Sequence, residues 1–184
     1  MDDPLDMKIS ERRRAFENNY RSSTFRERMI EHFFLAELLQ EFWIRQDVVE
    51  VSRPEVDSGC DLILEARDVI RHVQLKTMAR GAKTARQKIQ LSLGRKPSGC
   101  VVLIEFECLP SGRLGLRYRF FGGQPGHPMQ NIIHAHCVKH SKSNAMGEKA
   151  VRPKLRYIPK GEFEPVGSIK ELGERLFGPA SKRE

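Results

Sequence analysis

The order of helix-like and strand-like segments in this 184-residue sequence predicts one α/β fold with a central mixed β-sheet. Three observations support that prediction. Residues 25–45 have apolar side chains at a helical period and contain neither Gly nor Pro. Several β-branched runs separated by turn residues follow this segment. The run CVVLIEFE, from Cys100 to Glu107, is the most strand-like in the chain and is expected to be a buried central strand.

The first half of the sheet is expected to contain three strands. The β-branched run Val48–Ser52 ends before Pro54 and the turn residues 57–59. Asp61–Glu65 and Arg71–Lys76 then form a hairpin through a short charged turn.

A basic segment with the sequence AKTARQKIQLSLG, residues 82–94, is expected to be a helix that Gly94 ends. The buried strand follows it, and Leu116–Phe121 alternates as a further strand. The predicted order is therefore α-β-β-β-α-β-β.

The two ends of the chain are expected to flank this core, which we place at residues 25–121. Residues 1–24 form a polar arm or short helix that includes Arg12, Arg13 and Arg14. Residues 122–184 form a C-terminal extension.

Within that extension we expect a Gly- and His-rich loop in residues 122–154 and a short strand at residues 155–159. Ser168 and Glu171 form a capping box that opens a last helix, ending near Phe177.

Composition points to a cytoplasmic protein with a polyanionic partner. Lys and Arg total 32 against 24 Asp and Glu, a formal net charge of +8. Nucleic acid is the commonest such partner, although a solvated basic surface would have the same composition. No apolar run approaches the roughly 20 residues of a membrane helix, and the N-terminus does not read as a secretory signal. Four cysteines without a CxxC pair are expected to be reduced thiols.

Polar side chains stand where the predicted hairpin strands meet. Asp61 opens the first strand, and Gln74 and Lys76 end the second. Because strand side chains alternate, Gln74 and Lys76 share a face. An acid, an amide and an amine are therefore expected to converge at one end of the sheet.

A fourth polar group is expected from the long helix. At about 100° per residue, Glu31 falls on the same side as Phe34, Leu38 and Phe42. A carboxylate on a buried stripe needs a partner, which a cation or a metal ion would supply. If the helix is irregular, Glu37 takes the place of Glu31.

These residue types suit a hard divalent cation such as Mg²⁺ or Mn²⁺, which prefers oxygen ligands. Asp61, Gln74 and the backbone carbonyl of Leu75 are the candidate direct ligands, and Glu31 would hold a metal-bound water. Lys76 would orient or help to deprotonate the attacking water. The chemistry expected of this set is metal-assisted hydrolysis of a phosphodiester.

The pattern GCD (Gly59–Asp61) followed by QLKT (Gln74–Thr77) resembles the PD-(D/E)xK nuclease superfamily, most closely its Mrr-like restriction-endonuclease branch with a QxK motif. Archaeal Holliday-junction resolvases share that core. The resemblance covers about residues 25–107. It implies a restriction-endonuclease-like three-layer fold in which helices flank the mixed sheet of an αβββαβ core.

The resemblance also implies a catalytic set and a substrate. By motif, the set is Glu31, Asp61, Gln74 and Lys76, acting on DNA in preference to RNA, in restriction, defence or repair. A homodimer would supply the two sites that cleavage of a duplex needs.

Two departures from the superfamily pattern keep other functions open. No Pro-Asp dipeptide precedes the hairpin, and Gln74 replaces an acid, which removes one negative charge from the metal site. One alternative is a non-catalytic nucleic-acid-binding domain on the same fold. Another is a protein-interaction module of a larger system that uses the aromatic face of the long helix.

Two further clusters are candidates for binding. A basic group after the hairpin is expected either to bind the phosphate backbone or to be a solvated helix face. This group comprises Lys83, Arg86, Lys88, Arg95 and Lys96. His134, His136 and His140 have the chemistry of zinc ligands, but their spacing favours a surface loop.

Overall fold

The computed structural model describes residues 23–56, 59–140 and 147–179. The chain divides into two units, Met1–Ala36 and Glu37–Glu184, with the boundary inside the long helix. The basic residues Arg12–Arg14, nearly all of the expected N-terminal arm and part of the expected loop in 122–154 lie outside the described residues.

Within the described residues, the helices are α2 (Ser23–Ile44) and α3 (Ile169–Phe177), with short 3₁₀ helices η2 (Leu91–Arg95) and η3 (Lys160–Glu162). The strands are β1 (Glu50–Ser52), β2 (Leu62–Ala66), β3 (Val69–Ala79), β4 (Arg86–Gln90), β5 (Gly99–Cys108), β6 (Leu114–Gly122), β7 (Cys137–Lys139), β8 (Val151–Pro159) and β9 (Glu164–Val166).

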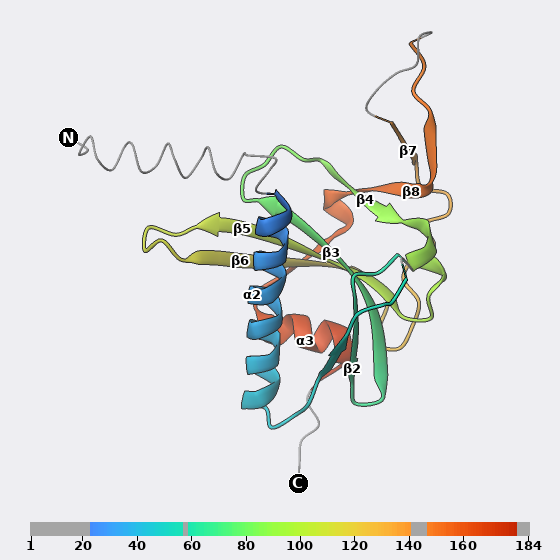
Figure 1. Cartoon of the computed structure of the whole chain (residues 1–184). Helices are drawn as coiled ribbons and strands as arrows, with labels where there is room; N and C mark the ends of the chain where they lie inside the picture. The colour runs from blue at the N-terminus through green and yellow to red at the C-terminus, as the bar shows by residue number, and fades with distance from the viewer. Residues whose placement is uncertain (1–22, 57–58, 141–146, 180–184) are drawn as a thin grey trace, which may run out of the picture. The chain divides into compact units, whose positions relative to one another are not determined.

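The larger of two sheets has the strand order β1-β2-β3-β5-β6-β9 (Figure 1). β3 and β5 pair in parallel, and the other neighbours pair antiparallel. The predicted α/β class with a mixed sheet is therefore confirmed. β5 is the expected central strand: its residues from Cys100 to Ile104 are completely buried.

The expected helix over residues 82–94 is wrong, because this segment forms β4 and η2. Its apolar residues Ile89, Leu91 and Leu93 recur every second position, which is the period of a strand. Gln87 and Ile89 are buried while Arg86 and Lys88 are exposed, so the alternation continues through β4. Pairing with β8, which lies more than 60 residues further along the chain, selects the strand.

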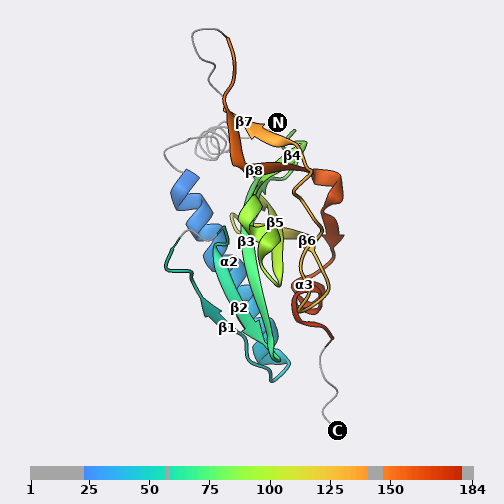
Figure 2. The ribbon, with the colours of Figure 1, turned by 90° about the vertical axis from the view of Figure 1, so that its right-hand side faces the viewer.

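A smaller sheet with the order β4-β8-β7 packs on one face of the larger sheet (Figure 2). Met78, Val101 and Leu103 of the large sheet share a core cluster with Ile89 and Ile158 of the small one. The layer on this face is therefore a sheet with a 3₁₀ helix, where the sequence predicted an α-helix.

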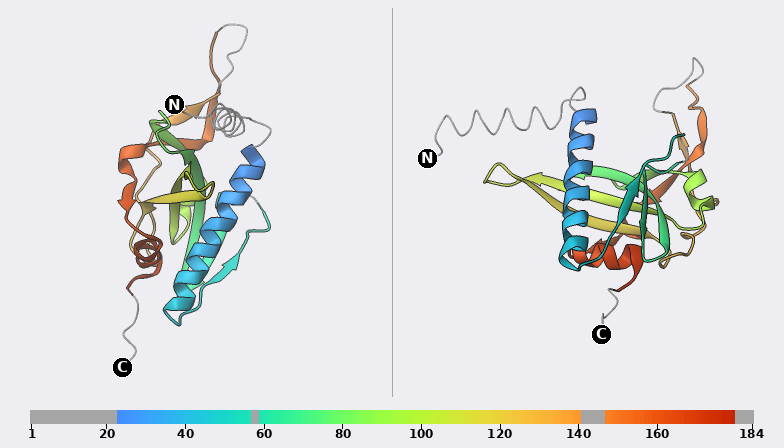
Figure 3. Two further views of the ribbon diagram at one scale, coloured as in Figure 1. Left: turned by 90° about the vertical axis from the view of Figure 1, so that its left-hand side faces the viewer. Right: turned by 60° about the horizontal axis from the view of Figure 1, so that its bottom comes forward.

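The opposite face of the large sheet is covered by α3, which crosses it as Figure 3 shows. Leu172, Leu176 and Phe177 are buried there, and the ring of Phe177 meets that of Phe42 edge to face. The predicted capping box is present: Ser168 Oγ accepts a hydrogen bond from Glu171 N–H at 3.1 Å. The Glu171 carboxylate accepts in turn from the preceding N–H, that of Gly167, at 2.8 Å.

α2 carries a stripe of buried apolar side chains. Phe34, Leu38 and Phe42 are buried as expected, but Leu39 is 45% exposed because it lies at the edge of the stripe. Trp43 is 83% exposed, so the aromatic face of this helix is in part a surface.

A buried arginine ties β3 to the end of α3. Arg71 Nε donates to Leu176 O at 2.7 Å, and its Nη2 donates to Arg175 O and Gly123 O at 3.0 Å. The carbonyls of Arg175 and Leu176 are at the C-terminus of α3 and have no partner within the helix, and a cation there also complements the helix dipole. Burial lowers the pKa of the Arg71 guanidinium, and the carbonyl oxygens offset the cost of burying it.

We expect Arg71→Met to lower the free energy of unfolding by about 2 to 4 kcal/mol, because one buried and two part-buried hydrogen bonds to carbonyls lose their charged donor. Urea denaturation followed by circular dichroism measures the change. Arg113→Met, at an exposed turn position, is the matched control and should change stability by less than about 0.5 kcal/mol. Equal effects of the two substitutions would contradict this role for Arg71.

Candidate active site

β3 lies between β2 and β5 in the sheet, and the candidate site lies where its pairing with β2 ends. β2 pairs with its first part, from Val69 to Val73, whereas β5 pairs with it from His72 to Ala79. β3 also extends three residues beyond Lys76, further than the sequence predicted. The site therefore lies on the sheet where β2 begins, and its expected position at one end of the sheet is wrong.

Asp61 lies immediately before β2 and is bound to the backbone of β3. Its N–H donates to Val73 O at 2.8 Å, and its Oδ2 accepts from Leu75 N–H at 2.7 Å. The N–H and carbonyl of one strand residue point to the same neighbouring strand, so the Leu75 carbonyl lies on the Asp61 side of β3. The Asp61 carboxylate and the Leu75 carbonyl, both proposed from the sequence as metal ligands, thus lie on the same edge of β3.

Gly59 explains the first motif in structural terms. Its φ of +85° lies in the left-handed region, and a Cβ built on it would be 2.1 Å from Ser92 Oγ and 3.1 Å from Gln90 Cβ. The chain before Asp61 therefore packs directly against the end of β4 and the start of η2. Cys60 is buried in the core cluster on the same face.

Gln74 is 5% exposed, and its side-chain oxygen Oε1 accepts from Gln90 N–H at 3.1 Å. Because Leu62 pairs with Val73, Asp61 and Gln74 are the next residues along the two strands. Gln74 is thus the register neighbour of Asp61, and its side-chain oxygen holds the end of β4. An amide oxygen has two lone pairs, so this bond leaves the capacity for a second interaction.

Lys76 is part-buried and lies two residues after Gln74, so the two side chains share the face that the small sheet covers. Leu75 lies on the opposite face, in register with Val102. The alternation predicted for this motif is present.

The two helix carboxylates have different settings. Glu31 is part-buried in α2 and belongs to the first unit, and its place beside Asp61 stays a prediction. Glu37, the substitute considered for it, accepts from the Tyr118 hydroxyl at 2.5 Å. Tyr118 is in register with Ile104, on the face of the sheet opposite Gln74, so Glu37 does not join the set. Burial, with the Glu37 carboxylate next in effect, raises the pKa of Tyr118 and keeps it a donor.

Glu105 is a further acid on the Gln74 face that the sequence did not single out. Burial by itself would raise its pKa, but Lys160 and Arg119 hold the pKa below its ordinary range. Their nitrogens lie 2.7 and 2.9 Å from the Glu105 carboxylate oxygen. This carboxylate is therefore neutralised by cations of the protein and is a poor candidate ligand.

The expected basic group does not form one helix face. Arg86 and Lys88 lie on the exposed side of β4, and Lys83 is exposed before it. Arg95 and Lys96 lie at the end of η2. Lys96 is close enough to His72 to reinforce the lowering of the His72 pKa, which is due first to burial. The group is thus divided between two parts of the surface.

Comparison of the sequence with protein-family models and with curated proteins found no match. Within residues 23–56, 59–140 and 147–179, no three His, Cys, Asp or Glu side chains form a metal-binding group; His134, His136 and His140 are all exposed. No helix in this part of the chain combines the length and apolar character that crossing a membrane requires.

We expect Gly59→Ala to lower the free energy of unfolding by about 2 to 4 kcal/mol, since a Cβ there adds a clash with Ser92 to the cost of a left-handed φ. Gly81→Ala is the matched control, because Gly81 has a φ of +77° and nothing within 4 Å of a Cβ. It should cost about 1 kcal/mol, the backbone effect alone. Thermal or urea unfolding gives both values, and a Gly59 effect no larger than that of Gly81 would show that the close approach to Ser92 is unimportant.

Proposed function

We propose that this protein is a divalent-metal-dependent nuclease that hydrolyses phosphodiester bonds of DNA. The observation that carries the proposal is the hydrogen bond between Asp61 and the Leu75 backbone, beside Gln74 and with Lys76 on the Gln74 face. The formal net charge of +8 supports a nucleic-acid substrate.

The donors at this position suit Mg²⁺ or Mn²⁺, which prefer oxygen ligands. Asp61 would contribute a carboxylate oxygen, Leu75 its backbone carbonyl and Gln74 its amide oxygen, with Glu31 acting through a water. A bound ion would polarise the scissile phosphate and lower the pKa of a coordinated water. Lys76 would orient the attacking water and offset negative charge on the phosphate.

The arrangement of strands supports the proposed restriction-endonuclease-like fold. A helix precedes β1, β2 and β3 along the chain, and β5 completes a mixed sheet in the order β1-β2-β3-β5. The connection from β3 to β5 departs from the αβββαβ pattern, because it contains β4 and η2 in place of a helix.

The same proposal includes membership of the PD-(D/E)xK superfamily, near its Mrr-like branch. It also includes a role in restriction, defence or repair, a cytoplasmic location, and a homodimer that would cut both strands of a duplex.

Gln74 favours a second candidate, a non-catalytic nucleic-acid-binding domain on this fold. Its oxygen already accepts the Gln90 N–H, it is buried, and it carries no charge for a cation. A site with this residue would bind a metal ion less tightly than one with Glu or Asp. The two candidates differ in whether metal binding and cleavage occur.

We expect the protein to cleave DNA with Mg²⁺ or Mn²⁺ and not with EDTA. Asp61→Asn and Lys76→Met should each reduce cleavage by about 100-fold or more. Asp68→Asn, at the exposed turn of the same hairpin, should cleave as the wild type does. Gel assays on plasmid, linear and single-stranded DNA, with RNA as a further substrate, measure these rates. No cleavage of any substrate, or cleavage unaffected by Lys76→Met, would reject the nuclease proposal.

Calorimetric titration with Mn²⁺ tests the metal site without catalysis. We expect wild-type binding to be abolished or weakened about tenfold or more by Asp61→Asn. Gln74→Glu keeps an acceptor for Gln90 N–H and adds a negative charge, so it should tighten binding by about tenfold or more. If neither substitution alters Mn²⁺ binding, these residues are not the ligands.

A further inference from the structure

The small sheet has an outer face that is strongly basic. Gln87, Ile89 and Ile158 are buried beneath the sheet, whereas Arg86 and Lys88 are exposed on its other side. Lys88 is in register with Tyr157 of β8, so an aromatic ring lies between the cations of neighbouring strands.

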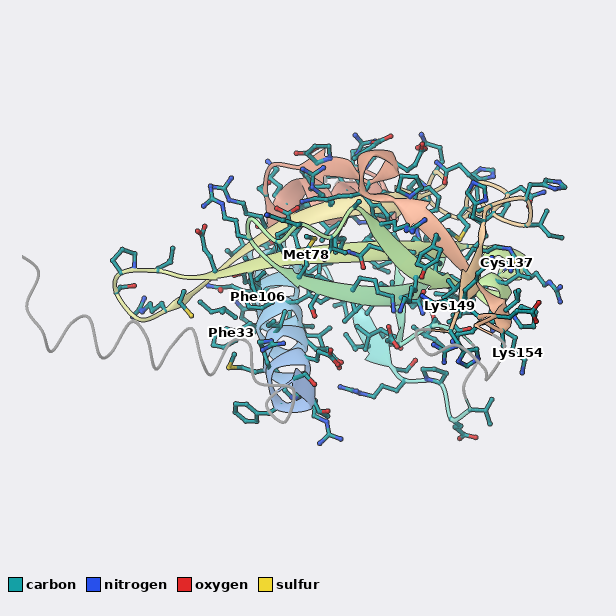
Figure 4. All side chains as sticks on the ribbon, turned by 90° about the horizontal axis from the view of Figure 1, so that it is seen from above. Phe33, Met78, Phe106, Cys137, Lys149 and Lys154 are labelled. Atoms are coloured by element: carbon teal, nitrogen blue, oxygen red, sulfur yellow. The ribbon has the colours of Figure 1, made fainter. Side chains whose placement is uncertain are left out.

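This outer face is hollowed by a cavity of about 630 Å³. Its lining includes five cationic side chains and one tyrosine: Arg86, Lys88, Lys139, Lys149, Arg152 and Tyr157. Two histidines and Cys137 complete it, and no Asp or Glu is among the described lining residues. Figure 4 shows Cys137 and Lys149 in this region, around β7 and β8.

The guanidinium of Arg86 lies over the Tyr157 ring, 4.3 Å from its centroid. This cation–π contact fixes a planar cation at the surface and leaves its nitrogens able to donate to phosphate oxygens. Lys139 and Arg152 approach the same cavity from β7 and β8. Positive charge from all three strands therefore converges on one surface. An anionic ligand there would offset the mutual repulsion of the cationic side chains.

We propose that this face binds the phosphate backbone of nucleic acid as an anchoring site distinct from the candidate active site. Five cations, four of them on three strands and Lys149 just before β8, match a chain of regularly spaced phosphates better than they match one small anion. The inference rests on nucleic acid being the substrate of the proposed function, but it concerns binding alone.

The position of the face along β4 gives it a geometric relation to the candidate site. Gln90, at one end of β4, donates to Gln74, whereas Arg86 is at the other end. Four residues of extended strand span about 13 Å, the length of about four nucleotides along one strand.

The test is the salt dependence of DNA binding, measured by fluorescence anisotropy in EDTA with a labelled duplex of about 30 base pairs. Lys88→Gln with Lys139→Gln should weaken binding and reduce the slope of log K against log salt by about 2. The control, Arg113→Gln with Lys170→Gln, removes the same charge from exposed positions elsewhere and should leave the slope unchanged. Equal slopes for both double variants would overturn the proposal.

Alkylation of Cys137 by iodoacetamide gives a second readout at the face itself, with the exposed Cys108 as internal control. Bound DNA should protect Cys137 and leave Cys108 reactive. Equal protection by inorganic pyrophosphate would assign the face to a small anion and overturn the proposal. Both measurements are made in EDTA on the Asp61→Asn variant, so the anchoring site is tested without cleavage. Wild-type protein that binds DNA in this way but does not cleave it with Mg²⁺ or Mn²⁺ would reject the nuclease and retain the anchoring site.

Discussion

The end of the pairing between β2 and β3 governs the hydrogen bonds of the candidate site and the contact between the two sheets. β2 is five residues long and β3 is eleven, so β3 continues beyond β2 while its other edge pairs with β5. The Leu75 N–H would lose its partner where β2 begins, and the Asp61 carboxylate supplies one. A polar residue is therefore required at this point by the hydrogen bonds of the backbone, whatever chemistry it also performs.

The same point joins the two sheets. Gln74 holds the end of β4 through the Gln90 N–H, and Gly59 admits Ser92 to a distance that a side chain would prevent. Gly59, Asp61 and Gln74 thus each have a structural role, in addition to any role in binding.

Much of the large sheet was predictable because its strands carry local signals. β5 is a continuous apolar run, and β2 and β3 alternate on either side of a charged turn. Residues 82–94 were predicted wrongly because their basic and Ala-containing composition suggested a helix. The spacing of two between Ile89, Leu91 and Leu93 was the correct signal. The outer basic face was not predictable, since it combines Arg86 and Lys88 with Lys139, Arg152 and Tyr157 through pairing across the sequence.

The sequence by itself determined the α/β class, the capped last helix, the excess of positive charge and the shared face of Gln74 and Lys76. These depend on periodicity, composition and local hydrogen bonds, which act over a few residues. Only the tertiary structure decided that Asp61 binds the Leu75 backbone, that Gln74 supports β4, and that Arg71 binds the end of α3. Those contacts join residues 14 to 105 positions apart, and a partner so distant is chosen by packing of the whole chain.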